Sequence, residues 1–367
     1  MKKMFFMAAI AGVALASCAK NEVETPEQDI ITFAEPVTAV QTKATEIVGN
    51  YPTSENFSVF AHYFTEDYTT LSDGLPYMWN VETAYNDGLN GWDSKAVADG
   101  VNYYWPKQGT LTFAAYSPSR ADDTDMVVEY SDRGIQFKNF CVKHAPTAQY
   151  DLLFSERAYN QTKADMTTHA DHYWGVQLKF NHALSSILFT VRTDKDYAAD
   201  NFKINVTKIE LKNVKWQGNF DQGLVDGNGR VTRANTEWPG WTVDNNTTVD
   251  YIAFEGDQLL NTTETRTKNI TNANNSNLIL LPQYLSHDVM LYVEYTIYNN
   301  NTGISIPQNA ELSIREYGNV QQWYRGNRYI YNITIGLDKI YFDPTVTEWV
   351  EIGAGNVTIG NTAQPAN

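Results

Sequence analysis

The chain lacks any apolar run long enough to cross a bilayer as a helix, which takes about 20 residues. Its longest run, residues 4–15, follows Lys2 and Lys3 and precedes small residues that end at Cys18. This is the layout of a secretory signal, and small residues directly before a cysteine are what a lipoprotein signal peptidase needs. We therefore predict that residues 1–17 are removed and that Cys18 is lipidated. An ordinary secretory signal with an incidental cysteine is the alternative.

Cysteine is almost absent, since Cys18 and Cys141 are the only two. If Cys18 carries lipid, Cys141 has no partner within the chain, and a disulfide framework is excluded. Stability must then come from the burial of apolar side chains. Cys141 lies between Phe140 and Val142, so we expect a small buried hydrophobic residue there and not a nucleophile.

Positive charge is scarce. Lys and Arg number 27 against 43 Asp and Glu, which gives a net charge of −16. Removal of Lys2 and Lys3 with the signal would make the charge −18, because −16 − 2 = −18. An acidic chain repels phosphate backbones, so nucleic acid is not an expected partner.

Helical patterning is missing as well. No segment carries a convincing apolar stripe at helical spacing, whereas short β-branched and aromatic runs recur between clusters of Gly, Pro, Asn and Asp. In the run Val289–Tyr298, every second residue from Val289 to Ile297 is apolar, which predicts a half-buried strand. Residues 83–101 are expected to form a loop. The pattern as a whole predicts an all-β fold built from sandwiches.

Motifs for catalysis and cofactors are also lacking. The chain has no phosphate-binding glycine loop, Gly-x-Ser-x-Gly or His-Glu-x-x-His sequence. The one cluster of metal-like composition, His169 and His172 with Asp165 and Asp171, lies in a polar segment without the helix of ordered zinc motifs. We therefore expect no catalytic residue, no metal and no cofactor. His182 is expected to be a hydrogen-bonded structural histidine.

The length of the chain favours two domains. Without the signal, 367 − 17 = 350 residues remain, which is more than one small core usually needs. Residues 18–43 begin with a polar, acidic segment typical of a solvated tether. Polar residues 160–171 separate two strand-rich halves, so we predict domains over 44–170 and 171–367.

Several segments, in this order, resemble one protein family. They are Tyr104-Trp105-Pro106 leading into residues 111–118, then Tyr150-Asp151-Leu152-Leu153, then residues 180–184 (Phe-Asn-His-Ala-Leu), and finally residues 323–331 (Trp-Tyr-Arg-Gly-Asn-Arg-Tyr-Ile-Tyr) followed by Val346 and Trp349. Each segment is weak evidence alone. Together, after a lipoprotein signal, they resemble the fimbrillin or Mfa-like family, whose members build the type V pili of Bacteroidales.

The resemblance implies two tandem transthyretin-like Greek-key β-sandwich domains and assembly by strand exchange. In that scheme an N-terminal strand fills a groove in the precursor, a protease removes it, and the terminal strand of another subunit replaces it. Asp29–Ala34 matches the removable strand, and Lys43-Ala44 matches the basic cleavage site, although the better-known site of the family uses Arg.

The C-terminal tail, residues 350–367, is the candidate donor strand. Its apolar residues alternate at Val350, Ile352, Val357 and Ile359, as a strand that fills alternate pockets requires. A loose tail or a simple edge strand is the alternative.

The resemblance thus implies a non-enzymatic subunit of a fimbria, with a stalk role favoured over an anchor or tip role. The expected partners are other fimbrial subunits, the outer membrane through lipid, an Arg/Lys-specific protease, and a host or bacterial surface ligand. The expected locations are the outer membrane for the lipid-anchored precursor and the fimbrium on the cell surface. A surface glycan-binding lipoprotein is the alternative, because nine Trp and 23 Tyr offer aromatic faces for sugars.

Overall fold

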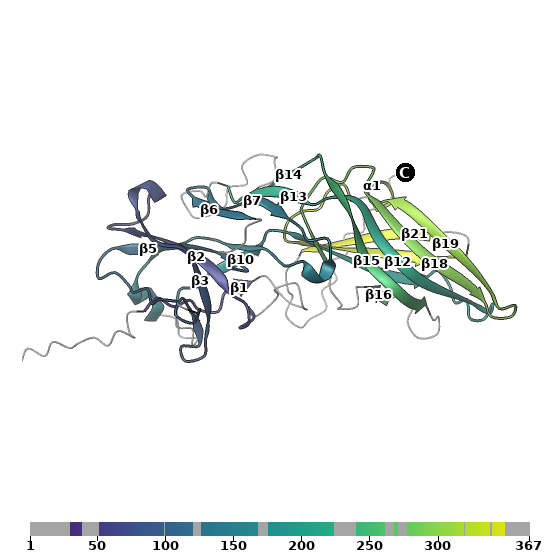
Figure 1. Ribbon diagram of the computed structural model, residues 1–367, viewed down its shortest axis with the longest axis horizontal. Helices are drawn as coiled ribbons and strands as arrows, with labels where there is room; N and C mark the ends of the chain where they lie inside the picture. The colour runs from purple at the N-terminus through teal and green to yellow at the C-terminus, as the bar shows by residue number, and fades with distance from the viewer. Residues whose placement is uncertain are drawn as a thin grey trace, which may run out of the picture.

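Regular structure in this protein is almost entirely β. The computed structural model describes residues 30–38, 51–98, 100–119, 126–167, 175–223, 240–260, 268–270, 277–318, 320–337 and 340–348. In these residues the strands form four sheets, arranged as an elongated body with the early strands at one end and the late strands at the other (Figure 1). The predicted all-β fold is confirmed.

Strands of three residues and strands of ten or more occur at both ends of the molecule. The strands are β1 (Val37–Thr38), β2 (Phe57–Phe64), β3 (Leu75–Asn86), β4 (Gly91–Asp93), β5 (Thr110–Ser117), β6 (Val127–Ser131), β7 (Gly134–Cys141), β8 (Leu153–Ser155), β9 (Ala158–Gln161), β10 (Lys179–His182), β11 (Ser185–Thr193), β12 (Phe202–Lys215), β13 (Gln217–Asp221), β14 (Trp241–Val243), β15 (Thr248–Leu260), β16 (Lys268–Ile270), β17 (Leu278–Leu280), β18 (Met290–Asn299), β19 (Ile304–Ser313), β20 (Asn327–Ile335) and β21 (Ile340–Glu348). Helical structure among the described residues is limited to α1 (Ile314–Gly318) and the 3-10 turns η2 (Leu71–Asp73), η3 (Pro146–Ala148) and η4 (Lys163–Thr167).

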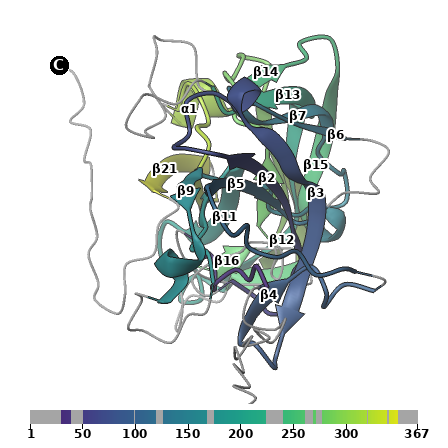
Figure 2. The ribbon, with the colours of Figure 1, turned by 90° about the vertical axis from the view of Figure 1, so that its left-hand side faces the viewer.

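The N-terminal end holds an eight-stranded sheet in the order β1-β10-β8-β5-β2-β3-β4, with β9 also pairing with β5. Figure 2 views this end directly, with β2, β3 and β5 in front of β12 and β15. Because side chains alternate along a strand, β2 places Val59 and Ala61 in one hydrophobic cluster and Phe60 in another. Both faces of β2 are therefore buried.

The face that carries Phe60 is covered by a four-stranded sheet in the order β14-β13-β7-β6. Between the two sheets, the ring of Phe220 lies 5.4 Å from that of Phe137 and 4.8 Å from that of Phe154. Strands β10 and β13 follow residue 170 in the sequence but pair with β8 and β7, which precede it, and β14 joins the same sheet through β13. The division at residue 170 stays a prediction, and residues 168–174 lie outside the described residues.

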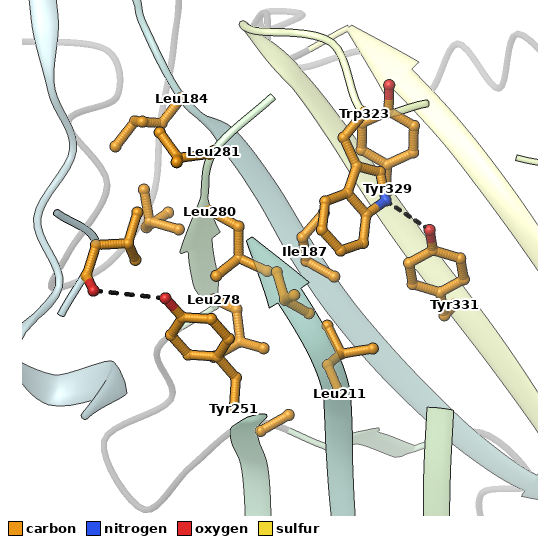
Figure 3. Packing of buried hydrophobic residues seen from close by; sticks show 14 of the residues in the cluster. Leu184, Ile187, Leu211, Tyr251, Leu278, Leu280, Leu281, Trp323, Tyr329 and Tyr331 are labelled. Atoms are coloured by element: carbon orange, nitrogen blue, oxygen red, sulfur yellow. Dashed lines mark hydrogen bonds between the residues drawn. The ribbon is translucent and has the colours of Figure 1, made fainter. Parts of the chain in front are cut away.

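The C-terminal end is built from two further sheets with a common core. One has the order β16-β11-β20-β21, with β17 also pairing with β11, and the other has the order β15-β12-β18-β19. Figure 3 shows part of this core, where the indole Nε1 of Trp323 donates a hydrogen bond of 2.7 Å to the hydroxyl of Tyr331. Strand β18 bears out the alternation seen in the sequence, since its buried side chains are Leu291, Val293, Tyr295 and Ile297.

Two local predictions were wrong. Cys141 is partly exposed, whereas its neighbours Phe140 and Val142 are 2% and 3% exposed. The alternation of β7 explains this, because inward-pointing neighbours place Cys141 on the opposite face. Residues 83–101 are not simply a loop, since β3 continues to Asn86 and a turn at 87–90 leads into β4. Among the described residues, no helix is long and apolar enough to span a membrane.

Candidate functional site: a buried N-terminal strand and its groove

Residues 30–34, most of the predicted removable strand, are described and lie buried at the N-terminal end. Ile31, Phe33 and Ala34 expose at most 2% of their surface, and Thr32 exposes 6%. Alternation of side chains would bury only one face of this segment. Here side chains on both faces are buried, and backbone lies along both edges. Burial of Ile31 and Phe33 at about 1.5–3 kcal/mol each favours the seated segment by roughly 3–6 kcal/mol.

The backbone of the segment is hydrogen-bonded on both sides. Phe33 bridges in antiparallel fashion to Trp92 and in parallel fashion to Val176. The bonds are Phe33 N to Trp92 O (2.8 Å), Trp92 N to Phe33 O (2.9 Å), Ile31 N to Tyr103 O (2.8 Å), Val176 N to Thr32 O (2.8 Å) and Ala34 N to Val176 O (3.1 Å). The segment therefore fills a gap between two stretches of backbone that are distant in sequence.

Strand β1 continues the same path. Val37 and Thr38 pair in parallel with Lys179 and Phe180 of β10. Without residues 30–38, the backbone at Trp92 and along β10 would present unpaired N–H and C=O groups, which is the condition that favours addition of another strand.

Aromatic side chains form the floor of this groove. The ring of Phe33 stands edge-on to those of Phe57 and Phe113, at 5.7 Å and 5.6 Å between centroids. Trp92 is 2% exposed and lies 5.5 Å from the ring of Tyr51. Such edge-to-face contacts add about 0.5–1.5 kcal/mol per pair to the burial term. An apolar side chain at the position of Phe33 is therefore strongly favoured.

Tyr51 begins the folded body after residues 39–50, which lie outside the described residues. Its hydroxyl group lies 2.7 Å from the Oγ atom of Ser117. Burial raises the pKa of Tyr51 well above its usual value, because the charged phenolate would lose its hydration. This residue thus fixes the chain next to the groove.

Gly175 allows the close approach of the segment. A Cβ atom at Gly175 would lie 2.5 Å from the amide nitrogen of Ala34 and 2.5 Å from the carbonyl carbon of Phe33. Both are backbone atoms that a rotamer change cannot move. Only glycine therefore fits while the strand is seated.

The other predicted site residues fall outside the described residues. These are the lipidation site Cys18, the processing site Lys43-Ala44, and the donor residues Val350, Ile352, Val357 and Ile359. Lys43 follows the buried strand in sequence and precedes Tyr51. A cut after Lys43 would therefore separate residues 30–38 from the body of the protein.

Three of the segments that resemble the family meet where the chain passes from β10 to β11. His182 Nδ1 lies 2.7 Å from Asp151 Oδ2, and these side chains are 2% and 0% exposed. Gly326 N donates a hydrogen bond of 2.8 Å to the carbonyl oxygen of Leu184. The expected structural role of His182 agrees with this geometry, because the pair joins the end of β10 to the residues just before β8 inside the protein.

The polar cluster considered as a metal site is only partly described. His169, Asp171 and His172 lie outside the described residues, whereas Asp165 accepts hydrogen bonds from the backbone and hydroxyl of Thr162. No group of three or more His, Cys, Asp or Glu side chains suited to a metal occurs in the described part of the chain.

Comparison with known families decides the assignment. The profile of the fimbrillin-like family matches residues 42–349. The chain belongs to the fimbrillin-like family. The match includes Lys43 and both ends of the folded body, but it leaves out the buried segment 30–34 and the tail from residue 350 onward. Membership in this family places the protein among structural fimbrial proteins and not among enzymes.

A solved structure shows the same fold. A fimbrial protein from Bacteroides vulgatus is 16% identical, and the alignment covers 87% of this chain and 99% of that chain at a TM-score of 0.56. A candidate cell adhesion protein from Bacteroides uniformis is also 16% identical, with 88% and 99% covered and a TM-score of 0.48. A search of curated protein sequences found no match.

The sequence did not reveal the walls of the groove. Trp92 lies in the stretch expected to be a loop, and Val176 follows a polar segment with no strand pattern of its own. The nearest signals are Gly91 next to Trp92 and Gly175 next to Val176, since glycine marks places where backbones approach closely.

Proposed function

We propose that this fimbrillin-like protein is a stalk subunit of a type V fimbria, polymerised by protease-triggered strand exchange and serving adhesion. The observation that carries the proposal is the N-terminal strand, buried and hydrogen-bonded on both sides, in a chain whose basic site Lys43 follows that strand. Removal of the strand would open a groove with an aromatic floor and unpaired edges. The strand of another subunit would pack apolar side chains against this floor and form hydrogen bonds with the unpaired edges.

The proposal includes export as a lipoprotein. Lipid on Cys18 would hold the precursor at the outer membrane, and a cut at Lys43-Ala44 by an Arg/Lys-specific protease would release residues 44–367 to join the fimbrium. The partners are then other copies or other fimbrial subunits, with Val350, Ile352, Val357 and Ile359 as the donor strand. We assign the two ends of the molecule to tandem transthyretin-like domains, which the pairing of sheets at each end supports.

The aromatic residues that kept the glycan-binding alternative open are largely core residues. Trp105 is 7% exposed and Trp323 is fully buried, each within a hydrophobic cluster. They support the fold, so the number of aromatic residues is no argument for a glycan-binding protein in place of a subunit.

The test is limited digestion of purified residues 19–367 with a Lys/Arg-specific protease. We expect a ladder of subunits on an unboiled gel and a new N-terminus at Ala44. Lys43→Ala is the matched control, because it removes the cleavage site without touching the groove, and it should stay monomeric. A variant without residues 350–367 should be cut but form no ladder.

Two results would contradict the proposal. One is continued polymerisation of Lys43→Ala under the same digestion. The other is a wild-type protein that is cut at Lys43, loses residues 30–38 and remains a stable monomer at high concentration.

A further inference from the structure

The segment that fills the groove has a four-residue pattern, and each of its positions has its own requirement. Ile31 and Phe33 are 2% and 0% exposed and belong to the same hydrophobic cluster, so both positions take large apolar side chains. Thr32 is 6% exposed, which suits a small polar side chain and disfavours a charge. Ala34 is 2% exposed and its backbone lies against Gly175, so this position takes a small residue. An occupant of the groove should therefore read apolar, small polar, apolar, small.

The tail of the chain contains a stretch with this pattern. Residues 357–360 read Val-Thr-Ile-Gly, against Ile-Thr-Phe-Ala at residues 31–34. The two stretches agree in kind at every position, and both have threonine at the second. Residues 350–353, the other alternating stretch of the tail, read Val-Glu-Ile-Gly. That stretch would place the carboxylate of Glu351 at the buried position of Thr32, where a charge is costly.

The direction of the incoming strand follows from the same comparison. In the opposite direction, Asn356 would stand at the position of Ala34, next to the backbone of Gly175, where a small residue is needed. The hydrogen bonds favour the same direction. The seated segment is antiparallel to Trp92 and parallel to Val176, and only a strand that runs the same way repeats both patterns.

We propose that Val357-Thr358-Ile359-Gly360 of a second copy of this chain takes the places of residues 31–34, in the same order and direction. This register rests on the proposed strand exchange and specifies which part of the tail enters the groove. Residues 356–364 then follow the path of residues 30–38 along Trp92 and β10. Residues 350–353 stay outside the groove and connect the incoming strand to its own subunit.

The pocket of Phe33 is filled only in part by Ile359. The ring of Phe33 stands edge-on to the rings of Phe57 and Phe113, and an isoleucine side chain makes no such ring contacts. The precursor therefore holds its own segment more tightly than it would hold the tail of a second copy. Cleavage is needed for the exchange, and a larger side chain at position 359 should strengthen it.

The test combines a protein that can only accept a strand with one that can only donate. The acceptor is residues 19–367 with Thr358→Glu, digested at Lys43, because a carboxylate at position 358 keeps its own tail out of a groove. The donor is the Lys43→Ala protein, whose groove stays filled. We expect the acceptor alone to remain monomeric. Mixed with the donor, it should form a one-to-one complex that grows no further, as measured by light scattering after gel filtration.

Two control variants match the changes in charge and in size. Asn361→Glu adds the same charge at the position that corresponds to Glu35, which is partly exposed, so the digested variant should form the wild-type ladder. On the donor, Ile359→Phe should tighten the complex at least tenfold, whereas Ala354→Phe, outside the stretch, should leave its affinity unchanged. The melting temperature of each undigested variant checks that the folded body is intact.

Two results would overturn this register and leave strand exchange standing. One is a digested Thr358→Glu protein that forms the same ladder as the wild type. The other is an Ile359→Phe donor that binds no more tightly than the Ala354→Phe donor. Absence of a ladder from the digested wild-type protein would overturn the proposed function and this inference together.

Discussion

The two ends of this molecule close their hydrophobic cores in different ways. At the C-terminal end, the 14 residues of β12 and the 10 residues of β18 pair with each other along a long ladder, and the core lies behind it. At the N-terminal end, part of the core is closed by residues 30–38, which are held by short stretches of hydrogen bonds on each side. A short segment can leave without unfolding its neighbours, whereas a central strand cannot.

The comparison shows which part of the molecule the proposed strand exchange would use. The segment at residues 31–34 is as well buried as a core strand, so it would cover the groove in the proposed precursor. Because few backbone bonds hold it, its loss after the proposed cleavage would cost much less than the opening of a sheet.

The largest effect is expected in the C-terminal core. Phe189 is 1% exposed and stacks on Tyr331 with ring centroids 5.7 Å apart. Phe189→Ala should lower the free energy of unfolding by about 3–5 kcal/mol, because it leaves a cavity between long strands. Chemical denaturation measures it, and unfolding should remain cooperative. A loss below about 1 kcal/mol would mean that this core adapts freely, which would weaken the contrast.

Truncation of the corresponding side chain in the N-terminal segment should act locally. Phe33→Ala should weaken seating of residues 30–38 by about 3 kcal/mol, since its contacts with Phe57 and Phe113 are lost. Hydrogen exchange should speed up at the amides of Trp92 and Val176, with no change in β12 or β18. Glu35→Ala is the control, because the Glu35 side chain is only partly buried. Faster exchange throughout both ends would show that the segment is not a separate unit.

Gly175→Ala should displace the same segment by steric contact. We expect a cost of about 1–3 kcal/mol, typical of overpacking, because the new Cβ would meet the backbone of Phe33 and Ala34. Cleavage at Lys43 should become faster, which timed digestion and mass spectrometry can measure. Gly88→Ala is the matched control in an exposed turn, where a Cβ would meet only the side chain of Asn86 at 3.3 Å. Equal cleavage rates for both variants would argue against a tight groove at Gly175.

The smallest effect concerns alkaline pH at the C-terminal end. Burial raises the pKa of Tyr329 to about 12, against about 10 for an unfolded tyrosine. The neutral phenol is favoured in the folded state, so the contribution of Tyr329 to stability is full below pH 10 and is lost as the pH rises toward 12. At pH 11 the loss should be on the order of 1 kcal/mol.

Tyr329→Phe should remove this part of the pH dependence. Its baseline stability should fall at every pH, because the Tyr324 amide loses an acceptor at 2.8 Å. Tyr317→Phe is the control, since Tyr317 is 60% exposed. Thermal melts at pH 8 and pH 11 give the comparison, and an unchanged pH dependence in Tyr329→Phe would contradict it.

Strand-rich segments and the family were predictable from short-range patterns. Alternation predicted β18 because burial of one face selects apolar residues at every second position. The prediction of a buried residue was wrong for Cys141. Its neighbours Phe140 and Val142 point inward, so Cys141 points toward the opposite face of the strand. The prediction of a loop was also wrong at residues 83–101, because Gly and Asn mark turns and do not tell how much of the flanking chain joins a sheet.

The candidate site was predictable only in part. The sequence identified Ile30–Ala34 as strand-like and Lys43 as a basic residue that follows it, because both are local features. It could not identify Trp92, Val176 or Gly175 as the walls of the groove. Those residues meet the segment through pairings between positions tens of residues apart, and no local pattern encodes such pairings.

The sequence by itself determined the all-β character of this protein, its acidic net charge and its resemblance to the fimbrillin-like family, since composition and local alternation carry that information. Tertiary structure decided which strands share a sheet, that β10 and β13 return to pair with β8 and β7, and that residues 31–34 are closed in from both sides. The physical reason is that hydrogen bonds between strands and contacts between faces depend on distance in space, which the order of residues constrains only weakly.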